Sequence, residues 1–349
     1  MIALLRELVE LESPTGDTAA MRDRAATELN GLGGRVAFEG EHVQADFAGA
    51  GAPLLLLGHV DTVWPRGTLA SMPWRLDDGR AYGPGSYDMK AGLVVMFEAI
   101  RRADAVRALR VVLTADEEIG SLTGRDVIAR AANGAVAALV CEPPTDKGDL
   151  KTARSGLGRF QLIVTGRAAH AAELRKRASA VEELARLILR LHALTDVERK
   201  VLLNVGVVSG GTRENVVAAE ARAWLDVRVP TYAERDRIDA FLRSLEPETP
   251  GTSIRLEGEW TRPPLERSDG GGRLFARARE HGRALGLDLH EASSTGGSDG
   301  NLAAAHGLPV LDGLGAEGGG AHAADEHVLV DSLDVRAELL ARILRDAGL

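Results

Sequence analysis

The stretch Leu54-Leu55-Leu56-Leu57-Gly58-His59-Val60-Asp61 decides the fold of this chain. A short apolar run that ends abruptly on polar residues is typical of a strand buried on both faces of a parallel sheet. Open α/β sheets gather ligands and catalytic groups at the carboxyl ends of such strands. His59 and Asp61 stand at that position, and imidazole and carboxylate groups are common ligands of zinc. The stretch therefore predicts an α/β fold with a candidate metal site at the ends of its strands.

Other parts of the chain supply more residues of the same kind. Two further apolar runs, Arg110–Thr114 and Ala137–Val140, end in acids, and two glycine-rich loops lead to another acid and to a distant histidine. The polar residues that these segments add are Asp88, Glu117, Glu118, Glu142 and His322. Together with His59 they form a set of nitrogen and oxygen ligands that does not include the single cysteine.

Each of these residues also has an ordinary explanation when it is taken alone. His59 is then a hydrogen-bonded structural histidine, Asp88 an N-cap of the following helix, and Glu142 a solvated loop acid. Asp61 is either a cap or a partner of His59, because a ligating imidazole usually donates its other N–H to a carboxylate. The pattern across the whole chain favours the functional interpretation over these single explanations.

The composition limits the protein class. The chain has 349 residues, 45% of them hydrophobic and 27% charged, which suits a globular protein of about two domains. Its net charge of −9 provides no general attraction to nucleic acid or to an anionic membrane, and no apolar stretch is long enough to span a bilayer. The single cysteine, Cys141, excludes an intramolecular disulfide and fits a reducing compartment. The N-terminus lacks the features of a signal peptide, so we expect a cytoplasmic protein.

The order of predicted elements divides the chain into a catalytic domain and an insertion. Helices over residues 2–32 are followed by alternating strands and helices to about residue 150, as in a parallel sheet covered by helices. The middle section instead predicts the order β-α-β-β-α-β, which is the ferredoxin-like arrangement. Its predicted strands and helices lie at Arg159–Thr165, Ser179–Leu194, Leu202–Val208, Ala219–Val229, Ile238–Leu245 and Ser253–Leu256. We therefore expect a discontinuous catalytic domain, 1–154 and 263–349, and an inserted domain, 155–262.

Four motifs in order resemble those of a known enzyme family. They are Gly58–Val63, Gly83–Gly92, Thr114–Gly120 and Glu142-Pro143. The chain resembles, over nearly its whole length, the co-catalytic zinc peptidases that include carboxypeptidase G (glutamate carboxypeptidase), acetylornithine deacetylase and succinyl-diaminopimelate desuccinylase. The resemblance implies a dizinc aminopeptidase-like catalytic domain, with helices on both faces of a mostly parallel sheet, and an inserted ferredoxin-like lid and dimerisation domain.

The resemblance also implies two zinc ions per subunit, with cobalt or manganese as possible substitutes. One ion would be held by His59, Asp88 and Glu142, and the other by Asp88, Glu118 and His322. Asp61 would orient His59, Glu117 would be the general base, and the Asp88–Met89 peptide would be cis.

In the inserted domain, the resemblance implies residues that act on the substrate. His170, in Gly166–Ala171, would reach the active site of the neighbouring subunit in a homodimer formed through residues 155–262. The family usually has Ser where this chain has Ala169. Substrate-binding roles are implied for Asn215, Arg228, Gly296 and Gly297.

Within this family the best match is the glutamate carboxypeptidase type, since Thr295–Asp299 and Gly313–Gly315 both favour it. The resemblance therefore implies hydrolysis of an amide bond next to a free carboxylate, in a small peptide or an N-acyl amino acid. An N-acyl-amino-acid deacylase is the alternative, because the bond and the metals would be the same. A non-catalytic binding protein is a third possibility, against which the presence of all five ligands and Glu117 argues.

Overall fold

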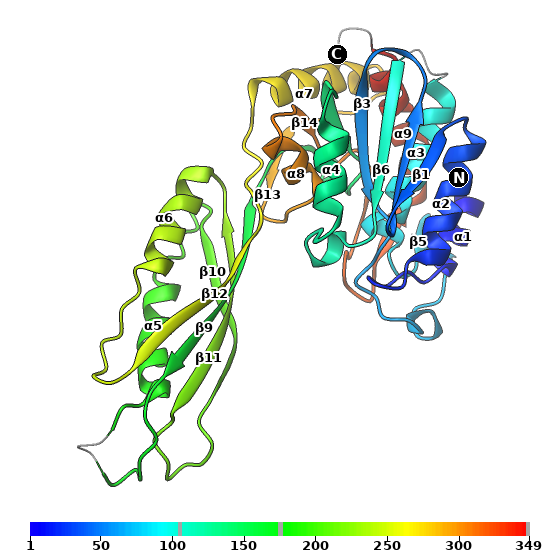
Figure 1. The fold of residues 1–349 in the computed structure, drawn as a ribbon. Coiled ribbons are helices and arrows are strands. Elements are labelled where there is room, and N and C mark those ends of the chain that lie inside the picture. Colours follow the sequence, from blue (N-terminus) through cyan, green and yellow to red (C-terminus); the bar gives the residue numbers. More distant parts are fainter. Residues whose placement is uncertain (104–106, 174–176, 347–349) are drawn as a thin grey trace. The chain divides into compact units, whose positions relative to one another are not determined.

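A computed structural model describes residues 1–103, 107–173 and 177–346 (Figure 1). The chain forms two compact units. Unit 1 comprises Met1–Ala153, Arg267–Ser294 and the chain from Ser298 onward, and unit 2 comprises Arg154–Glu266 and Thr295–Gly297. Unit 2 thus includes a short segment, Thr295–Gly297, that the sequence prediction assigned to the catalytic domain.

The main sheet of unit 1 has the strand order β1-β2-β6-β3-β7-β14. Its strands are β1 (Arg35–Glu39), β2 (His42–Phe47), β3 (Ala50–His59), β6 (Arg107–Thr114), β7 (Ala137–Val140) and β14 (Val310–Leu311). The last four of these are parallel to one another, whereas β1 and β2 pair in antiparallel fashion at one edge. Each residue from Leu54 to His59 is buried, which confirms that β3 is a central strand.

Helices cover both faces of this sheet (Figure 1). They are α1 (Ile2–Glu10), α2 (Ala19–Gly31), α3 (Ala91–Ala103), α4 (Gly124–Ala132), α7 (Asp269–Arg283), α8 (Asp299–Ala305) and α9 (Val330–Arg345). Figure 1 shows α3 and α9 on one face and α4 and α8 on the other. Leu54 and Leu56 pack into the core on the α3 side, because alternate side chains of a strand point to opposite faces. None of the described helices is long and apolar enough to cross a bilayer.

Unit 1 contains two small sheets that the sequence analysis did not predict. One has the order β15-β16-β5-β4, built from β4 (Arg75–Asp77), β5 (Arg80–Tyr82), β15 (Gly318–Gly319) and β16 (His327–Leu329). The other pairs β8 (Leu150–Arg154) with β13 (Glu291–Ser294). In the first, β16 pairs with β5. This pairing brings the loop before β16 against the loop that follows β5, and each loop carries a predicted ligand.

Unit 2 has the predicted β-α-β-β-α-β order. Its elements are β9 (Gly156–Thr165), α5 (Ala180–His192), β10 (Leu202–Gly210), β11 (Glu220–Val229), α6 (Tyr232–Arg243) and β12 (Ser253–Arg262). The four strands form an antiparallel sheet in the order β10-β11-β9-β12, and Figure 1 shows α5 and α6 along one of its faces. Ser179 and Thr231 begin these helices by accepting backbone N–H bonds at their N-termini. The predicted fold class is confirmed.

Candidate metal centre and catalytic site

The predicted ligands come together where strands of the main sheet end. His59 is the last residue of β3, Glu142 follows β7, and Glu118 lies in a short helical turn, η3 (Glu117–Ile119), after β6. Asp88 lies in the irregular turn η2 (Ser86–Lys90), and His322 lies between β15 and β16. These residues form two groups that each offer three ligand atoms within 4.8 Å of one another.

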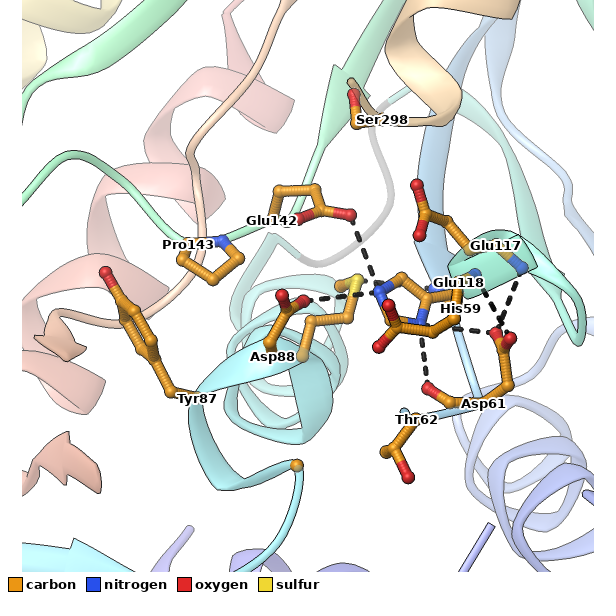
Figure 2. Close-up of polar contacts among 12 residues, drawn as sticks. His59, Asp61, Thr62, Tyr87, Asp88, Glu117, Glu118, Glu142, Pro143 and Ser298 are labelled. Carbon is orange, nitrogen blue, oxygen red and sulfur yellow. Dashed lines mark hydrogen bonds and ion pairs between the residues drawn. The ribbon is translucent and has the colours of Figure 1, made fainter. Parts of the chain in front are cut away.

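Asp88 belongs to both groups and directs one oxygen to each. In the first group, His59 Nε2 lies 3.4 Å from Asp88 Oδ1 and 3.5 Å from Glu142 Oε1 (Figure 2). In the second, His322 Nε2 lies 3.3 Å from Asp88 Oδ2 and 3.3 Å from Glu118 Oε2. A carboxylate shared in this way would suit two adjacent cations.

Three atoms of these groups fit a bound cation for a second reason. His59 Nε2, Asp88 Oδ1 and Glu118 Oε1 are buried and make no hydrogen bond within the described part of the chain. A buried polar atom without a partner is costly, so such atoms need an explanation. Metal ions bound by the two groups would satisfy all three atoms.

The acids around His59 and His322 raise the pKa values of both imidazoles. Burial by itself lowers the pKa of His59, but the neighbouring carboxylates of Asp61, Asp88 and Glu142 outweigh it and raise that pKa well above its usual value. Hydrogen bonds to Asp88 and Glu118 raise the pKa of His322 to about 10. The acids therefore favour positive charge at both imidazoles, as they would favour it in a metal ion.

Asp61 makes more hydrogen bonds within the site than the sequence analysis predicted. His59 Nδ1 donates to the backbone carbonyl of Asp61 at 2.9 Å, and the Asp61 carboxylate lies 3.4 Å from the same nitrogen. That carboxylate also accepts the backbone N–H groups of Glu117 and Glu118 at 3.1 and 3.2 Å (Figure 2). Because a carbonyl only accepts, Nδ1 carries a proton and Nε2 faces the acids. Asp61 thus fixes both the imidazole and the turn that carries the two glutamates.

Glu117 is half-buried beside the first group. Its charge adds to that of the other acids in raising the pKa of His59. Figure 2 shows its side chain extending away from Asp61. Adjacent residues of one turn therefore play different parts, since Glu118 contributes an atom to a ligand group and Glu117 does not.

Two backbone features mark the ligand loops. The Asp88–Met89 peptide is cis, as the resemblance predicted. His322 has φ of 63°, a left-handed conformation that few residues other than glycine adopt. The surrounding structure has to impose such a conformation on a residue that has a side chain.

The predicted substrate-binding residues lie in unit 2, whereas both ligand groups lie in unit 1. His170 and Asn215 are exposed and lie on adjoining segments, because Ala171 N donates to the Asn215 carbonyl at 3.0 Å. Arg228 donates from Nε to Asp226 Oδ1 at 2.8 Å and from Nη1 to the Thr295 carbonyl at 3.2 Å.

The Thr295–Gly297 segment of unit 2 is hydrogen-bonded to the buried side chain of Arg154. Arg154 Nη1 donates to the carbonyls of Gly296 and Gly297 at 3.4 and 3.1 Å. Through Thr295, the same segment is joined to Arg228. Three of the four predicted substrate-binding residues are therefore linked in one short network.

Sequence reasoning missed two buried acids near the ligand loops. Asp299 accepts the hydroxyl of Thr114 at 2.6 Å and that of Ser121, so it joins both ends of the turn that carries Glu117 and Glu118. Glu326 accepts hydrogen bonds from the backbone around Asp88. In the sequence, Asp299 stood only as part of the Thr295–Asp299 motif and Glu326 as an isolated acid, and the burial of both side chains is what distinguishes them.

Known proteins resemble this chain in sequence and in fold. Carboxypeptidase G2 of Pseudomonas sp. (strain RS-16) is 32% identical and covers 100% of this chain and 89% of its own length. Succinyl-diaminopimelate desuccinylase of Rhodospirillum centenum is 28% identical over 95% of this chain and 93% of its own. The crystal structure of aminopeptidase PepT from Bacillus cereus superposes with a TM-score of 0.85 at 22% identity, covering 100% of this chain and 98% of that one.

The sequence profile described as peptidase family M20/M25/M40 matches residues 55–346, which include all five predicted ligands. This match covers well over half of the chain, and the relative with 32% identity spans its whole length. The chain therefore belongs to peptidase family M20/M25/M40 and is an enzyme of the metallopeptidase and amidohydrolase class.

Proposed function

We propose that this protein hydrolyses an amide bond next to a free carboxylate, as a carboxypeptidase of the glutamate carboxypeptidase type. The observation that carries the proposal is the pair of ligand groups that share Asp88, with Glu117 beside them. Such a site suits the activation of water against a carbonyl. The 32% identity to carboxypeptidase G2 supports this type of reaction.

In this proposal the site binds two zinc ions, and cobalt or manganese can replace them. His59, Asp88 and Glu142 hold one ion, and Asp88, Glu118 and His322 hold the other. The bound ions supply Lewis-acid activation of the substrate carbonyl and of the attacking water. Asp61 keeps the His59 imidazole and the Glu117–Glu118 turn in place through the hydrogen bonds described above.

Glu117 acts as the general base. Its carboxylate takes a proton from the attacking water and later gives that proton to the leaving amine. Glu117 suits both steps because Asp61 ties its backbone to His59, while Glu117 contributes no atom to either ligand group.

Residues of unit 2 select and orient the substrate in this proposal. Arg228 binds the carboxylate next to the scissile amide, because a planar guanidinium suits a carboxylate. His170 donates to the developing oxyanion from the partner subunit of a homodimer formed through residues 155–262. Asn215, Gly296 and Gly297 complete the contacts with the substrate.

An N-acyl-amino-acid deacylase is the alternative, and the similarity to succinyl-diaminopimelate desuccinylase favours it. A panel of substrates separates the two. The zinc-loaded enzyme is assayed on peptides and N-acyl compounds with C-terminal glutamate, on N-acetyl and N-succinyl amino acids, and on their methyl esters. Preference for C-terminal glutamate supports the carboxypeptidase, and preference for a small acyl group supports the deacylase. Equal cleavage of acids and methyl esters contradicts both.

A further inference from the structure

Glu326 has an unusual environment for an acid outside the ligand groups. Its relative exposure is 0%, and its carboxylate accepts hydrogen bonds from four N–H donors among the described residues. Oε1 accepts the backbone N–H groups of Tyr87 and Asp88, each at 3.0 Å. Oε2 accepts the backbone N–H of Gly85 at 2.9 Å and the indole N–H of Trp64 at 2.7 Å.

These four donors identify the form of the side chain that the site needs. An ionised carboxylate accepts about four hydrogen bonds and donates none, and these contacts use that full capacity. A protonated acid or an amide would place a donor against at least one N–H group. The four N–H donors around Glu326 are therefore satisfied best by an ionised carboxylate.

The four hydrogen bonds connect three segments that carry ligands. Three donors belong to Gly85–Asp88, which ends on the carboxylate shared by both ligand groups. Trp64 lies five residues after His59 in the loop that follows β3. Glu326 itself lies four residues after His322, and its backbone carbonyl accepts the N–H of Gly83 at 3.4 Å.

We propose that Glu326 is a positioning residue that holds the backbone of Asp88 and, through it, both metal groups in their binding geometry. The inference rests on the proposed metal-dependent function. Glu326 is not a ligand, because its carboxylate lies on the N–H side of the turn and is occupied by these donors. Residues that orient ligands typically change metal affinity by about 10–100-fold when they are replaced.

The decisive variant is Glu326→Gln, which preserves the shape of the side chain and removes its charge. One end of the amide then presents N–H groups to N–H donors, so the Asp88 turn shifts. We expect affinity for Zn²⁺, measured by competition with a chromogenic chelator, to fall by about 10–100-fold. We expect kcat to fall with little change in KM, and the visible spectrum of the Co²⁺-loaded protein to change.

The chain provides a matched control in Glu183. This side chain is also 0% exposed and accepts the backbone N–H groups of Glu248 and Thr249, but it lies in unit 2, which contributes no atom to the ligand groups. Glu183→Gln removes a buried backbone anchor in the same way. We expect it to lower the melting temperature and to leave Zn²⁺ affinity and the Co²⁺ spectrum unchanged.

A second variant that disturbs the structure less tests the proposal if Glu326→Gln does not fold. Trp64→Phe removes one of the four donors without changing charge, and we expect a smaller loss of Zn²⁺ affinity in the same direction. The positioning role is overturned if the folded Glu326→Gln variant keeps wild-type affinity and an unchanged Co²⁺ spectrum. If Glu326→Gln does not fold, the same result in Trp64→Phe overturns it. The proposed function stands in either case. A wild-type protein that binds neither Zn²⁺ nor Co²⁺ overturns both.

Discussion

At the scale of single residues, the proposed mechanism assigns base chemistry and metal binding to two adjacent glutamates. Glu118 contributes an atom to a ligand group, whereas Glu117 lies beside His59 outside both groups. We expect Glu117→Gln to retain both metals and to lose turnover by about 10²–10⁴-fold, because the general base is removed. Glu118→Ala should lose metal. Metal analysis and kcat of the two variants check this, and near-normal turnover by a metal-loaded Glu117→Gln protein would exclude the base assignment.

Arg228 tests the origin of substrate selectivity. Its side chain is 36% exposed and pairs with Asp226 two residues earlier on the same strand. We expect Arg228→Ala to reduce kcat/KM for carboxylate substrates by the equivalent of about 2–4 kcal/mol, and Arg228→Lys to reduce it less. Methyl esters should be poor substrates of the wild type, and Arg228→Ala should discriminate little between acids and esters.

Arg222 is the control for this variant. It lies on the same strand, is 39% exposed and pairs with Glu220, also two residues earlier. Arg222→Ala should therefore have no effect on kcat/KM. Equal losses in the two variants would assign the effect of Arg228 to the strand and not to the substrate carboxylate.

Part of the site follows from the sequence at this scale, and part does not. The proximity of His59, Glu118 and Glu142 was predictable, because buried parallel strands leave a clear apolar pattern and their carboxyl ends meet at one edge of the sheet. The roles of Glu326 and Asp299, and the bonds from Asp61 to the Glu117–Glu118 turn, were not. They depend on which loops meet in space, and an isolated acid in a loop gives no sign of its partners.

At the scale of elements, strands and helices with a clear apolar pattern were predictable, and elements without one were not. The pattern of β7 matches its observed bounds, since four consecutive apolar residues form it. By contrast, β15 has two residues, Gly318 and Gly319, and no periodicity can reveal such a strand. The segment Thr295–Gly297 belongs to unit 2 through its hydrogen bonds with Arg154 and Arg228, which sequence order does not indicate.

The absence of a side chain at Gly92 allows α3 to pack closely against the end of β7. A methyl group at Gly92, in α3, would overlap the carbonyl of Cys141, the residue before Glu142. We expect Gly92→Ala to cost about 1–3 kcal/mol in the free energy of unfolding and to weaken metal binding, because α3 must move away from the end of β7. Urea denaturation and Zn²⁺ titration measure the two effects. Gly31→Ala is the control, since a methyl group there meets no atom within 4 Å.

At the scale of the whole molecule, the proposed homodimer makes each active site dependent on two chains. His170→Ala and Glu117→Gln proteins should each be nearly inactive. When they are mixed under conditions that exchange subunits, about a quarter of wild-type activity should return, because half of the dimers are mixed and each contains one intact site. Light scattering establishes the oligomeric state. No recovery in exchanged dimers, or full activity in a strict monomer, would exclude action between subunits.

The two ligand groups differ in their access to solvent. The His59 side chain is 1% exposed and that of His322 is 50% exposed, although both face the same Asp88 carboxylate. Exchange of the two ions should therefore proceed at different rates, with the ion beside His322 leaving first. Dialysis against a weak chelator should trap a singly loaded protein, and a second metal added to it should yield a heterobimetallic enzyme. Stopped-flow traces of Zn²⁺ release should accordingly show two phases, and His322→Ala should abolish the faster one.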